Sequence, residues 1–423
     1  MKKILPDLIH RKEGRRMKVI DGGVTAPKGF LAASTAAGIK YKDRSDMAMI
    51  YSTVPCKAAG TFTTNVVKAA PVLYDKKIVT ESKSVQAVVV NAGIANACTG
   101  AEGFGYCEDT AKKTAAELNI AEDAVLVAST GVIGMQLPIQ KLESGIEVMA
   151  KELSDTREAA HQAACAIMTT DTISKEVAVT FEAGGKTVTV GGMCKGSGMI
   201  HPNMCTMLGF VMTDAAISKE LLQEALSADV CDTYNMISVD GDTSTNDTVL
   251  LLANGMAENP KITEKNEDYR KFCEALNYVN TEIAKMMAGD GEGATALFEV
   301  KVIGAKSKEE AKILSKSVVC SSLTKAAIYG HDANWGRILC ALGYSGVEFD
   351  PEKVDLVFES DAGSIQIIKN GIAVDYSEEE ATRILSEPAV TAIANMNQGN
   401  AEATAWGCDL TYDYVKINAD YRS

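Results

Sequence analysis

The order of apolar and polar positions predicts alternating strands and helices over residues 1–290. Continuous apolar runs indicate buried strands over 47–53, 86–93, 124–128, 207–213 and 248–255. Helices are expected over 110–118, 139–153, 157–168 and 269–291, the first two because apolar residues recur at i, i+3 and i+4. Thr156 is placed to cap the third helix. Segment 175–192 is typical of a β-hairpin that turns at Gly184 and Gly185.

After residue 290 the pattern changes. Strand-like segments lie over 296–305, 354–360, 364–374 and 408–421, with a helix over 307–319. We therefore predict an α/β (α+β) fold in two domains, with layered sheets covered by helices. The main domain is expected over 17–288 and a smaller C-terminal α+β domain over 289–423.

The composition is that of an ordinary globular protein, because 46% of the 423 residues are hydrophobic and 23% are charged. The 42 basic and 56 acidic residues give a formal net charge of −14, which argues against nucleic acid or an anionic membrane as the main partner. The chain has no apolar stretch of about 18 residues. Its start lacks the apolar run of about 7–15 residues that defines a signal peptide. We therefore expect a cytoplasmic protein without a membrane partner.

The cysteines and histidines limit the chemistry. Eleven cysteines occur without any C-x-x-C pair, which fits neither a disulfide framework nor a zinc site and favours free thiols in a reducing compartment. A mechanism that needs histidine must use His10, His161, His201 or His331. We expect no metal.

Two loop segments look at first like ligand sites. AGDGEGATA (288–296) lacks the G-x-G-x-x-G spacing of a dinucleotide fold, and a helix rather than a strand precedes it. A tight turn that presents Glu292 is the better interpretation. DGDTSTNDT (240–248) starts like a calcium loop, but Thr245 and Leu251 stand where Gly and Glu are required. A turn whose side chains bond its own backbone is simpler, and we expect no cofactor.

Segment 191–215, GGMCKGSGMIHPNMCTMLGFVMTDA, carries candidate chemistry. Lys195 lies among glycines and is either solvated or placed to meet a carboxylate. In a structural interpretation, Thr206 packs by its methyl group before the strand that follows. In a functional interpretation, Thr206 attacks the carbonyl of Cys205 and cuts the chain. The new N-terminal threonine then has a hydroxyl nucleophile and an α-amine as its base. In ASTGVIG (128–134), a strand ending at Ser-Thr-Gly presents N–H groups that can stabilise an oxyanion.

These segments together resemble the ornithine acetyltransferase family, also called glutamate N-acetyltransferase. KGSGMIHPNMCTML (195–208) is similar to the family's processing site, KGSGMIHPNMATML, which is cut between Ala and Thr. Further blocks match the family in order from Met17: GVTAPKGFLAAS, FTTNVVKAAPV, NAGIANACTG, ASTGVIG, AIMTTDT, ISVDGDTSTNDT, GDGEGAT, HDANWGRI and YVKINADYRS. On these blocks the chain is identified as a member of the family.

The resemblance implies a layered αββα-type sandwich for the main domain and a C-terminal tail that returns to the active site. It implies autocatalytic cleavage between Cys205 and Thr206 into chains 1–205 and 206–423, assembled as α2β2. Thr206 aligns with the family's nucleophile, and Thr130 and Gly131 align with its oxyanion hole. The residues that align with substrate-binding positions are Thr169, Lys195, Thr206, Glu292, Asn418 and Ser423.

The implied reaction moves an acetyl group from N2-acetylornithine to glutamate in arginine biosynthesis. An acetyl-Thr206 intermediate predicts ping-pong kinetics. Lys195 suits the α-carboxylate of an amino acid, and Glu292 suits an ammonium group such as the side-chain amine of ornithine. Some family members also accept acetyl-CoA, so that molecule is a candidate substrate here.

Several positions depart from the family pattern. Cys205 stands where alanine is usual, Ile94 replaces an asparagine, Ala296 stands where lysine is frequent, and Ser423 replaces a threonine. Residues 1–16 lie outside the resemblance, so we expect translation to start at Met17, or these residues to be a dispensable tail.

Two other functions stay open, as does a second nucleophile. An N-terminal-nucleophile amidase or aminopeptidase of the same fold passes the acyl group to water instead of an amine. The other alternative is a non-enzymatic binding protein, or a chain whose processing has been lost. Cys205 is the competing nucleophile, although cleavage would leave it at the end of a chain.

Overall fold

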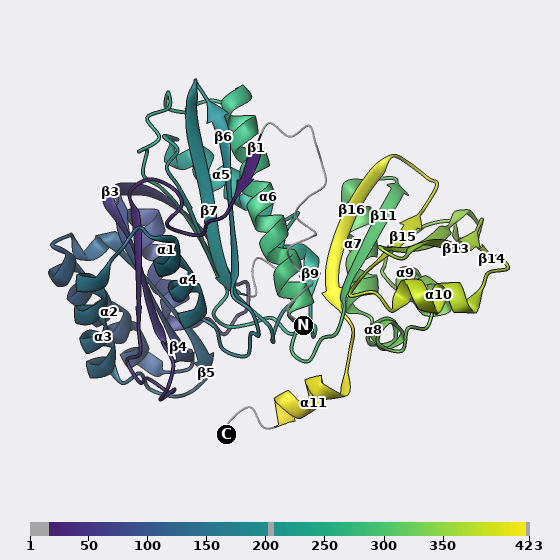
Figure 1. The fold of residues 1–423 in the computed structure, drawn as a ribbon, viewed down its shortest axis with the longest axis horizontal. Helices are drawn as coiled ribbons and strands as arrows, with labels where there is room; N and C mark the ends of the chain where they lie inside the picture. Colours follow the sequence, from purple (N-terminus) through teal and green to yellow (C-terminus); the bar gives the residue numbers. More distant parts are fainter. Residues whose placement is uncertain (1–16, 202–206, 420–423) are drawn as a thin grey trace. The chain divides into compact units, whose positions relative to one another are not determined.

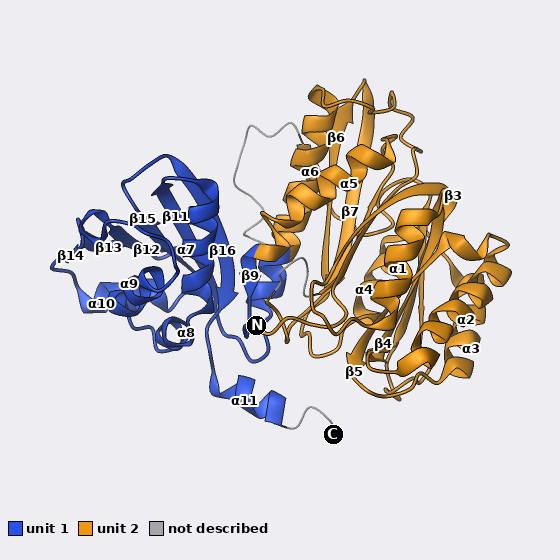
Figure 2. Cartoon of the chain, turned by 180° about the vertical axis from the view of Figure 1, so that it is seen from behind, with its two compact units in different colours: residues 1–14, 236–241, 284–423 blue, residues 15–235, 242–283 orange. Residues whose placement is uncertain are grey.

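The computed structural model of the chain describes residues 17–201 and 207–419. They form two compact units, which Figure 2 shows in different colours. The larger unit comprises residues 17–201, 207–235 and 242–283, and the smaller unit comprises residues 236–241 and 284–419. Residues 236–241 and 284–288, which the sequence assigned to the main domain, group with the C-terminal residues.

The larger unit is built on a nine-stranded sheet (Figure 1). Its strands are β1 (Met17–Ile20), β2 (Phe30–Thr35), β3 (Met47–Phe62), β4 (Val85–Ile94), β5 (Val125–Val132), β6 (Lys175–Ala183), β7 (Lys186–Lys195), β8 (Leu208–Thr213) and β10 (Thr248–Ala253). The order is β1-β6-β7-β8-β10-β3-β4-β5, and β2 also pairs with β3. The first part of β3 pairs with β2 and β4, and its last part, from Lys57, pairs with β10. Strand β3 therefore joins two halves of the sheet.

A shared hydrophobic core holds these two halves together. It contains Met47 and Val88 from one half, and Phe210 and Leu250 from the other. Strands β4, β8 and β10 are buried on both faces or nearly so, which explains why each of them is a continuous apolar run in the sequence.

Helices cover the sheet of the larger unit. They are α1 (Ala70–Glu81), α2 (Gly100–Leu118), α3 (Ile139–Glu152), α4 (Arg157–Ala166), α5 (Lys219–Val230) and α6 (Glu267–Gly289), the last of which ends in the smaller unit. Helices α1 and α2 pack on β5, and α5 packs on β3 and β10. Thr156 caps α4, since its hydroxyl accepts a hydrogen bond from the Ala159 N–H at 3.2 Å, as predicted.

The smaller unit contains a seven-stranded sheet. Its strands are β9 (Ile237–Ser238), β11 (Leu297–Ala305), β12 (Asp355–Ser360), β13 (Gly363–Lys369), β14 (Ile372–Ala373), β15 (Ala389–Asn395) and β16 (Ala401–Cys408), in the order β14-β13-β12-β15-β11-β16-β9. Its other helices are α7 (Lys308–Cys320), α8 (Ser322–Tyr329), α9 (Trp335–Gly343), α10 (Glu378–Leu385) and α11 (Tyr412–Ala419). Helix α7 packs on β11 and β16. Short 3-10 turns lie at Glu122–Ala124, Tyr234–Met236 and Pro351–Lys353.

The predicted α/β (α+β) class with layered sheets covered by helices is confirmed. The expected strand over 408–421 is wrong, because β16 ends at Cys408 and residues 412–419 form α11. The segment Tyr-Asp-Tyr-Val-Lys-Ile nearly alternates between apolar and polar residues, which imitates a strand, yet Tyr412 and Val415 are exposed on the helix.

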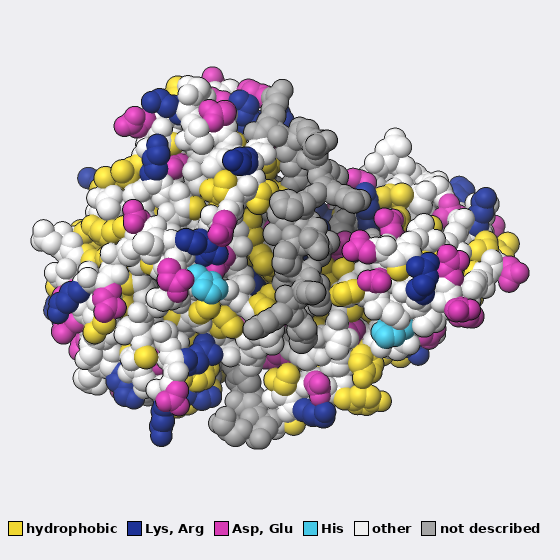
Figure 3. All heavy atoms as spheres, viewed as in Figure 1, with side chains coloured by type: hydrophobic (Ala, Val, Ile, Leu, Met, Phe, Trp, Pro, Cys, Tyr) yellow, Lys and Arg dark blue, Asp and Glu magenta, His cyan; other side chains and the backbone are white. Residues whose placement is uncertain are grey.

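The surface shown in Figure 3 carries acidic and basic side chains side by side over both units. In the described part of the chain, every helix is too short or too polar to cross a membrane. Within the same residues, His, Cys, Asp and Glu side chains form no group of three that could bind a metal ion.

Candidate active site

Thr130 and Gly131 lie near the end of β5, the edge strand that runs parallel to β4. Gly131 has a φ of +130°, which side chains of L-residues rarely adopt. A Cβ at this position would lie 2.2 Å from the carbonyl carbon of Gly93 on β4. The close approach of the two backbones therefore requires glycine here. Thr130 is buried.

The carboxylate of Asp171 joins two predicted binding residues, Thr169 and Lys195. Its Oδ2 accepts a hydrogen bond from the Thr169 N–H at 3.0 Å. Its Oδ1 accepts from the Gly196 N–H, directly after Lys195, and from the Lys175 ammonium, both at 2.7 Å. The side chains of Asp171 and Lys175 are completely buried. The structure thus brings Thr169 and Lys195 together around a carboxylate that the sequence analysis did not single out.

Charge determines the protonation of this cluster. Burial by itself would raise the pKa of the Asp171 carboxyl. The ammonium groups of Lys175 and Lys195, together with the hydrogen bonds from Lys175 and Gly196, outweigh burial and hold that pKa below its ordinary value. Lys195 is only 8% exposed, and its charge acts on the Asp171 carboxylate.

The two sides of the predicted cleavage site lie next to the same segment. Cys205 and Thr206 themselves are outside the described residues. Before them, the carbonyl of His201 accepts a hydrogen bond from the Thr243 hydroxyl at 2.8 Å. After them, the carbonyl of Met207 accepts from the Thr248 N–H at 2.8 Å.

Strand pairing places Lys195 close to the start of β8. Leu208, two residues after Thr206, pairs with Lys195 of β7 on one side and with Thr248 of β10 on the other. The register of the sheet therefore puts the chain that leaves Thr206 beside the buried ammonium of Lys195.

In the smaller unit, Glu292 and Asn418 contact each other. Asn418 Nδ2 donates a hydrogen bond to Glu292 Oε2 at 2.7 Å, and Glu292 is buried. The turn after Glu292 requires glycine, because Gly293 has a φ of +70° and a Cβ there would lie 2.7 Å from the Tyr414 nitrogen of α11. The tight turn predicted around Glu292 is confirmed. Ser423, which was predicted with these two residues, lies outside the described range.

The calcium-like segment 240–248 contains a turn bonded to its own side chains, as expected. Ser244 Oγ accepts from the Asn246 N–H at 3.1 Å, and Thr248 Oγ1 donates to the Asn246 carbonyl at 3.0 Å. Asn246 in this turn also donates hydrogen bonds to the carbonyls of Ala95 and Ser129. Both lie more than 100 residues away, and a single sequence carries no signal for such pairing.

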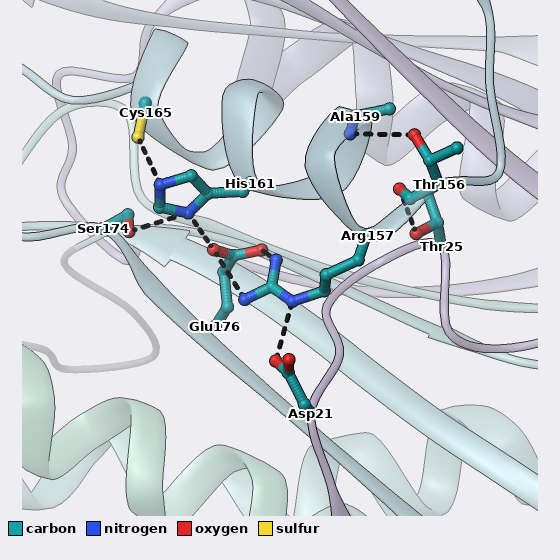
Figure 4. Close-up of polar contacts among 9 residues, drawn as sticks. All are labelled: Asp21, Thr25, Thr156, Arg157, Ala159, His161, Cys165, Ser174 and Glu176. Atoms are coloured by element: carbon teal, nitrogen blue, oxygen red, sulfur yellow. Dashed lines mark hydrogen bonds and ion pairs between the residues drawn. The ribbon is translucent and has the colours of Figure 1, made fainter. Parts of the chain in front are cut away.

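A second polar cluster surrounds Glu176 (Figure 4). Arg157 forms ion pairs with Glu176 at 2.7 Å and with Asp21 at 2.9 Å. The Nδ1 of His161 lies 2.8 Å from Glu176, and its Nε2 lies 3.7 Å from Cys165 Sγ. The order Cys-His-Glu is that of a nucleophile with its base. Burial, however, raises the pKa of the Cys165 thiol, which disfavours the nucleophilic thiolate. The ion pairs of Arg157 link α4 with β6 and with Asp21, directly after β1.

Comparison with known proteins gives one consistent result. Residues 31–423 match the model of the ArgJ family. The arginine biosynthesis bifunctional protein ArgJ 1 of Clostridium acetobutylicum is 53% identical over 408 residues, which are 96% of this chain and 99% of that protein. The corresponding protein of Caldanaerobacter subterraneus is 51% identical and is covered over its whole length, together with 96% of this chain. A solved ornithine acetyltransferase from Mycobacterium tuberculosis, complexed with ornithine, has 41% identity and a TM-score of 0.42, covering 44% of this chain and 98% of that one.

These findings first define a class: the protein is an acyltransferase of arginine biosynthesis. Within that class, the chain belongs to the ArgJ family. The predictions of family, enzyme class and pathway are confirmed.

The environment of Gly131 predicts an effect on stability. Gly131→Ala is expected to lower the free energy of unfolding by more than the roughly 1–3 kcal/mol of backbone strain, because the new Cβ also meets the backbone of Gly93. Gly134→Ala is the matched control, since Gly134 has a φ of +84° and a Cβ added there would meet no atom within 4 Å. Denaturant unfolding compares the two variants. Equal losses would mean that the contact with Gly93 has no effect.

The buried ion pair predicts a larger effect. Asp171→Asn removes a charge that pairs with the buried Lys175 ammonium at 2.7 Å and is expected to cost about 3–5 kcal/mol of unfolding free energy. Glu274→Gln removes one partner of an exposed pair with Arg270 and should cost less than about 1 kcal/mol.

The same ion pair predicts a dependence of stability on pH. Because the folded state lowers the pKa of Asp171, the contribution of Asp171 to the free energy of unfolding is complete above the unfolded pKa of about 3.9. That contribution is lost as the pH falls below this value. Unfolding curves at several pH values measure both effects. An Asp171→Asn variant with the acid sensitivity of the wild type would contradict this assignment.

Proposed function

We propose that the protein transfers an acetyl group from N2-acetylornithine to glutamate through an ester on Thr206. The observation that carries the proposal is the position of Lys195, a buried lysine whose charge acts on Asp171 while Lys175 forms the ion pair with that carboxylate. An ammonium group in such a position suits an anionic ligand such as a carboxylate. Acetylornithine and glutamate both carry an α-carboxylate, so one cation can hold the donor and then the acceptor.

In the first half-reaction, the Thr206 hydroxyl attacks the acetyl carbonyl of acetylornithine. A bond forms between Thr206 Oγ and the carbonyl carbon, and the bond from that carbon to the ornithine nitrogen breaks. The α-amine of Thr206, free after cleavage, takes the hydroxyl proton and passes it to the leaving amine. An α-amine suits this task because its ordinary pKa is about 7.7–8.0.

In the second half-reaction, the α-amine of glutamate attacks the acetyl ester. The bond from the carbonyl carbon to Thr206 Oγ breaks, and the proton released by the amine returns to the hydroxyl. N-acetylglutamate leaves and the free threonine is restored. Because ornithine departs before glutamate enters, the kinetics are ping-pong.

We assign the oxyanion of both half-reactions to the Thr130–Gly131 turn. The burial of Thr130 and the close approach of the Gly131 and Gly93 backbones support this assignment, because they give the turn a fixed position. A donor in such a position is worth about 10²–10³ in rate in other acyl-transfer enzymes. Gly131 gives the turn its backbone conformation.

We assign substrate binding to Thr169, Lys195 and Thr206 in the larger unit and to Glu292, Asn418 and Ser423 in the smaller unit. Lys195 meets the α-carboxylate and Thr169 supplies a hydrogen bond. Glu292 meets an ammonium group of the substrate. The hydrogen bond from Asn418 to Glu292 supports the pairing of these two, because it fixes the direction of the carboxylate.

The proposal includes the maturation of the chain. Cleavage between Cys205 and Thr206 produces chains 1–205 and 206–423, which assemble as α2β2 in the cytoplasm. The hydrogen bonds that hold His201 and Met207 support this, since they fix the backbone on both sides of the cleaved segment.

Substitution at the cleavage site tests the nucleophile. Thr206→Ala is expected to abolish both chain cleavage and acetyl transfer, because it removes the attacking hydroxyl. Cys205→Ala restores the residue usual in the family and should keep both activities. Denaturing electrophoresis measures cleavage, and formation of N-acetylglutamate from acetylornithine and glutamate measures transfer. Transfer that survives Thr206→Ala but not Cys205→Ala would make Cys205 the nucleophile. Release of acetate without transfer would favour an amidase.

We also propose acetyl-CoA as a second acetyl donor. The relatives are named bifunctional proteins, which supports a second activity. N-acetylglutamate should form from acetyl-CoA and glutamate without acetylornithine, and Thr206→Ala should abolish this reaction too, because both donors acylate the same hydroxyl. Product that forms only when acetylornithine is present would limit the enzyme to one donor.

A further inference from the structure

The side-chain amide of Asn246 is buried between two distant parts of the larger unit. Its Nδ2 donates hydrogen bonds to the carbonyl of Ala95 at 2.6 Å and to that of Ser129 at 2.7 Å. Its Oδ1 accepts from the Thr245 hydroxyl at 2.7 Å. The residue is 8% exposed. Both N–H groups of the amide therefore bond to distant backbone, directly after β4 and within β5, and not to the turn that contains Asn246.

The two carbonyls frame the Thr130–Gly131 turn. The Ser129 carbonyl belongs to the peptide group whose nitrogen is that of Thr130. Ala95 is also bonded to the other end of the turn, because its N–H donates to the Val132 carbonyl at 3.0 Å. Asn246 thus closes a ring that runs from Ala95 through the amide to Ser129, along the turn, and back from Val132 to Ala95.

The segment that carries Asn246 is itself firmly attached. Thr63 donates two hydrogen bonds to it, from its hydroxyl to the Ser244 carbonyl and from its N–H to the Asp247 carbonyl, both at 2.9 Å. The same segment holds Met207 through the Thr248 N–H at 2.8 Å. Hydrogen bonds from one short stretch of backbone, 243–248, therefore hold both Met207, the residue after Thr206, and the Thr130–Gly131 turn.

We propose that Asn246 is a positioning residue for acyl transfer. It holds the Thr130–Gly131 turn at a fixed position relative to Met207, the residue after Thr206. This proposal rests on the function proposed above. Asn246 does not touch the substrate in this assignment. It fixes the Ser129 carbonyl, and through it the peptide that begins the turn.

The expected effect follows from the geometry of acyl transfer. An oxyanion donor acts only when it lies within hydrogen-bonding distance of the position that the oxyanion occupies in the transition state. A displacement of about 1 Å costs about a hundredfold in rate. The ground-state substrate is held elsewhere, by Lys195 and Thr169 around Asp171, so a displaced turn lowers kcat and leaves KM nearly unchanged.

Asn259 provides a matched control in the same unit. It is 5% exposed, and its Nδ2 donates to the carbonyls of Ala216 at 3.2 Å and Pro260 at 2.8 Å. Its Oδ1 accepts from the Ala216 N–H at 2.8 Å. It is a buried amide that bonds two carbonyls, as Asn246 does, but those carbonyls belong to the β8–α5 and β10–α6 connections, which carry no proposed site residue.

The experiment compares Asn246→Ala and Asn246→Asp with Asn259→Ala and Asn259→Asp in the full-length chain. Melting temperature reports stability. Both kcat and KM are measured for acetylornithine, and kcat is calculated per amount of cleaved chain. If the alanine and aspartate variants at 246 do not fold, Asn246→Ser, which keeps one donor, replaces them. Both pairs should lose stability. Only the Asn246 variants should lose about tenfold to a hundredfold in kcat with KM within about twofold of the wild type.

The outcomes separate this inference from the function on which it rests. Equal kcat for the Asn246 and Asn259 variants, or a rise in KM that accounts for the whole loss at Asn246, would overturn the positioning role. Wild-type enzyme that releases acetate from acetylornithine without acetylating glutamate would overturn the proposed acceptor. In that case the kcat for hydrolysis still compares the two asparagines, because hydrolysis passes through the same oxyanion.

Discussion

The candidate site depends on one buried carboxylate. Asp171 receives hydrogen bonds from the backbone of Thr169 and Gly196 and from the ammonium of Lys175. A buried charge is costly unless such donors surround it, so the three segments that supply them have little freedom to move apart. One of these donors follows Lys195 at the end of β7, and another begins β6. The hydrogen bonds that satisfy the Asp171 carboxylate therefore also bring Thr169 and Lys195 together.

Two lysines lie near this carboxylate, and they interact with it differently. Lys175 forms an ion pair with Asp171 at 2.7 Å, and both side chains are completely buried. Lys195 is 8% exposed and lowers the pKa of Asp171 through its charge. In the function proposed here, Lys175 stabilises the carboxylate of Asp171, and the ammonium of Lys195 is left to meet the α-carboxylate of the substrate.

The sequence predicted those features that depend on local pattern. The apolar run over 86–93 became β4 with an error of one residue at each end, and Thr156 caps α4 as expected. The helix expected over 110–118 begins at Gly100, because Gly100, Gly103 and Gly105 look like a loop although the helix contains them. Motifs located Thr130, Lys195 and Glu292 through resemblance to a family. Asn246 escaped notice because its partners Ala95 and Ser129 lie more than 100 residues away, and no local pattern encodes such partners. Asp171 did have a local signal, because it pairs with Lys175 four residues later.

Two buried polar side chains restrain the strands on either side of the start of β8. Leu208, two residues after Thr206, pairs with Lys195 on one side and Thr248 on the other. Asp171 restrains the first neighbour through the Gly196 N–H, and the segment that contains Asn246 restrains the second. The chain leaving Thr206 is therefore fixed from both sides by backbone bonds. A hydroxyl nucleophile that carries its own amine as base needs orientation more than a separate base. Carboxylate and amide groups that organise the backbone can supply that orientation, so the proposed mechanism requires none of the four histidines.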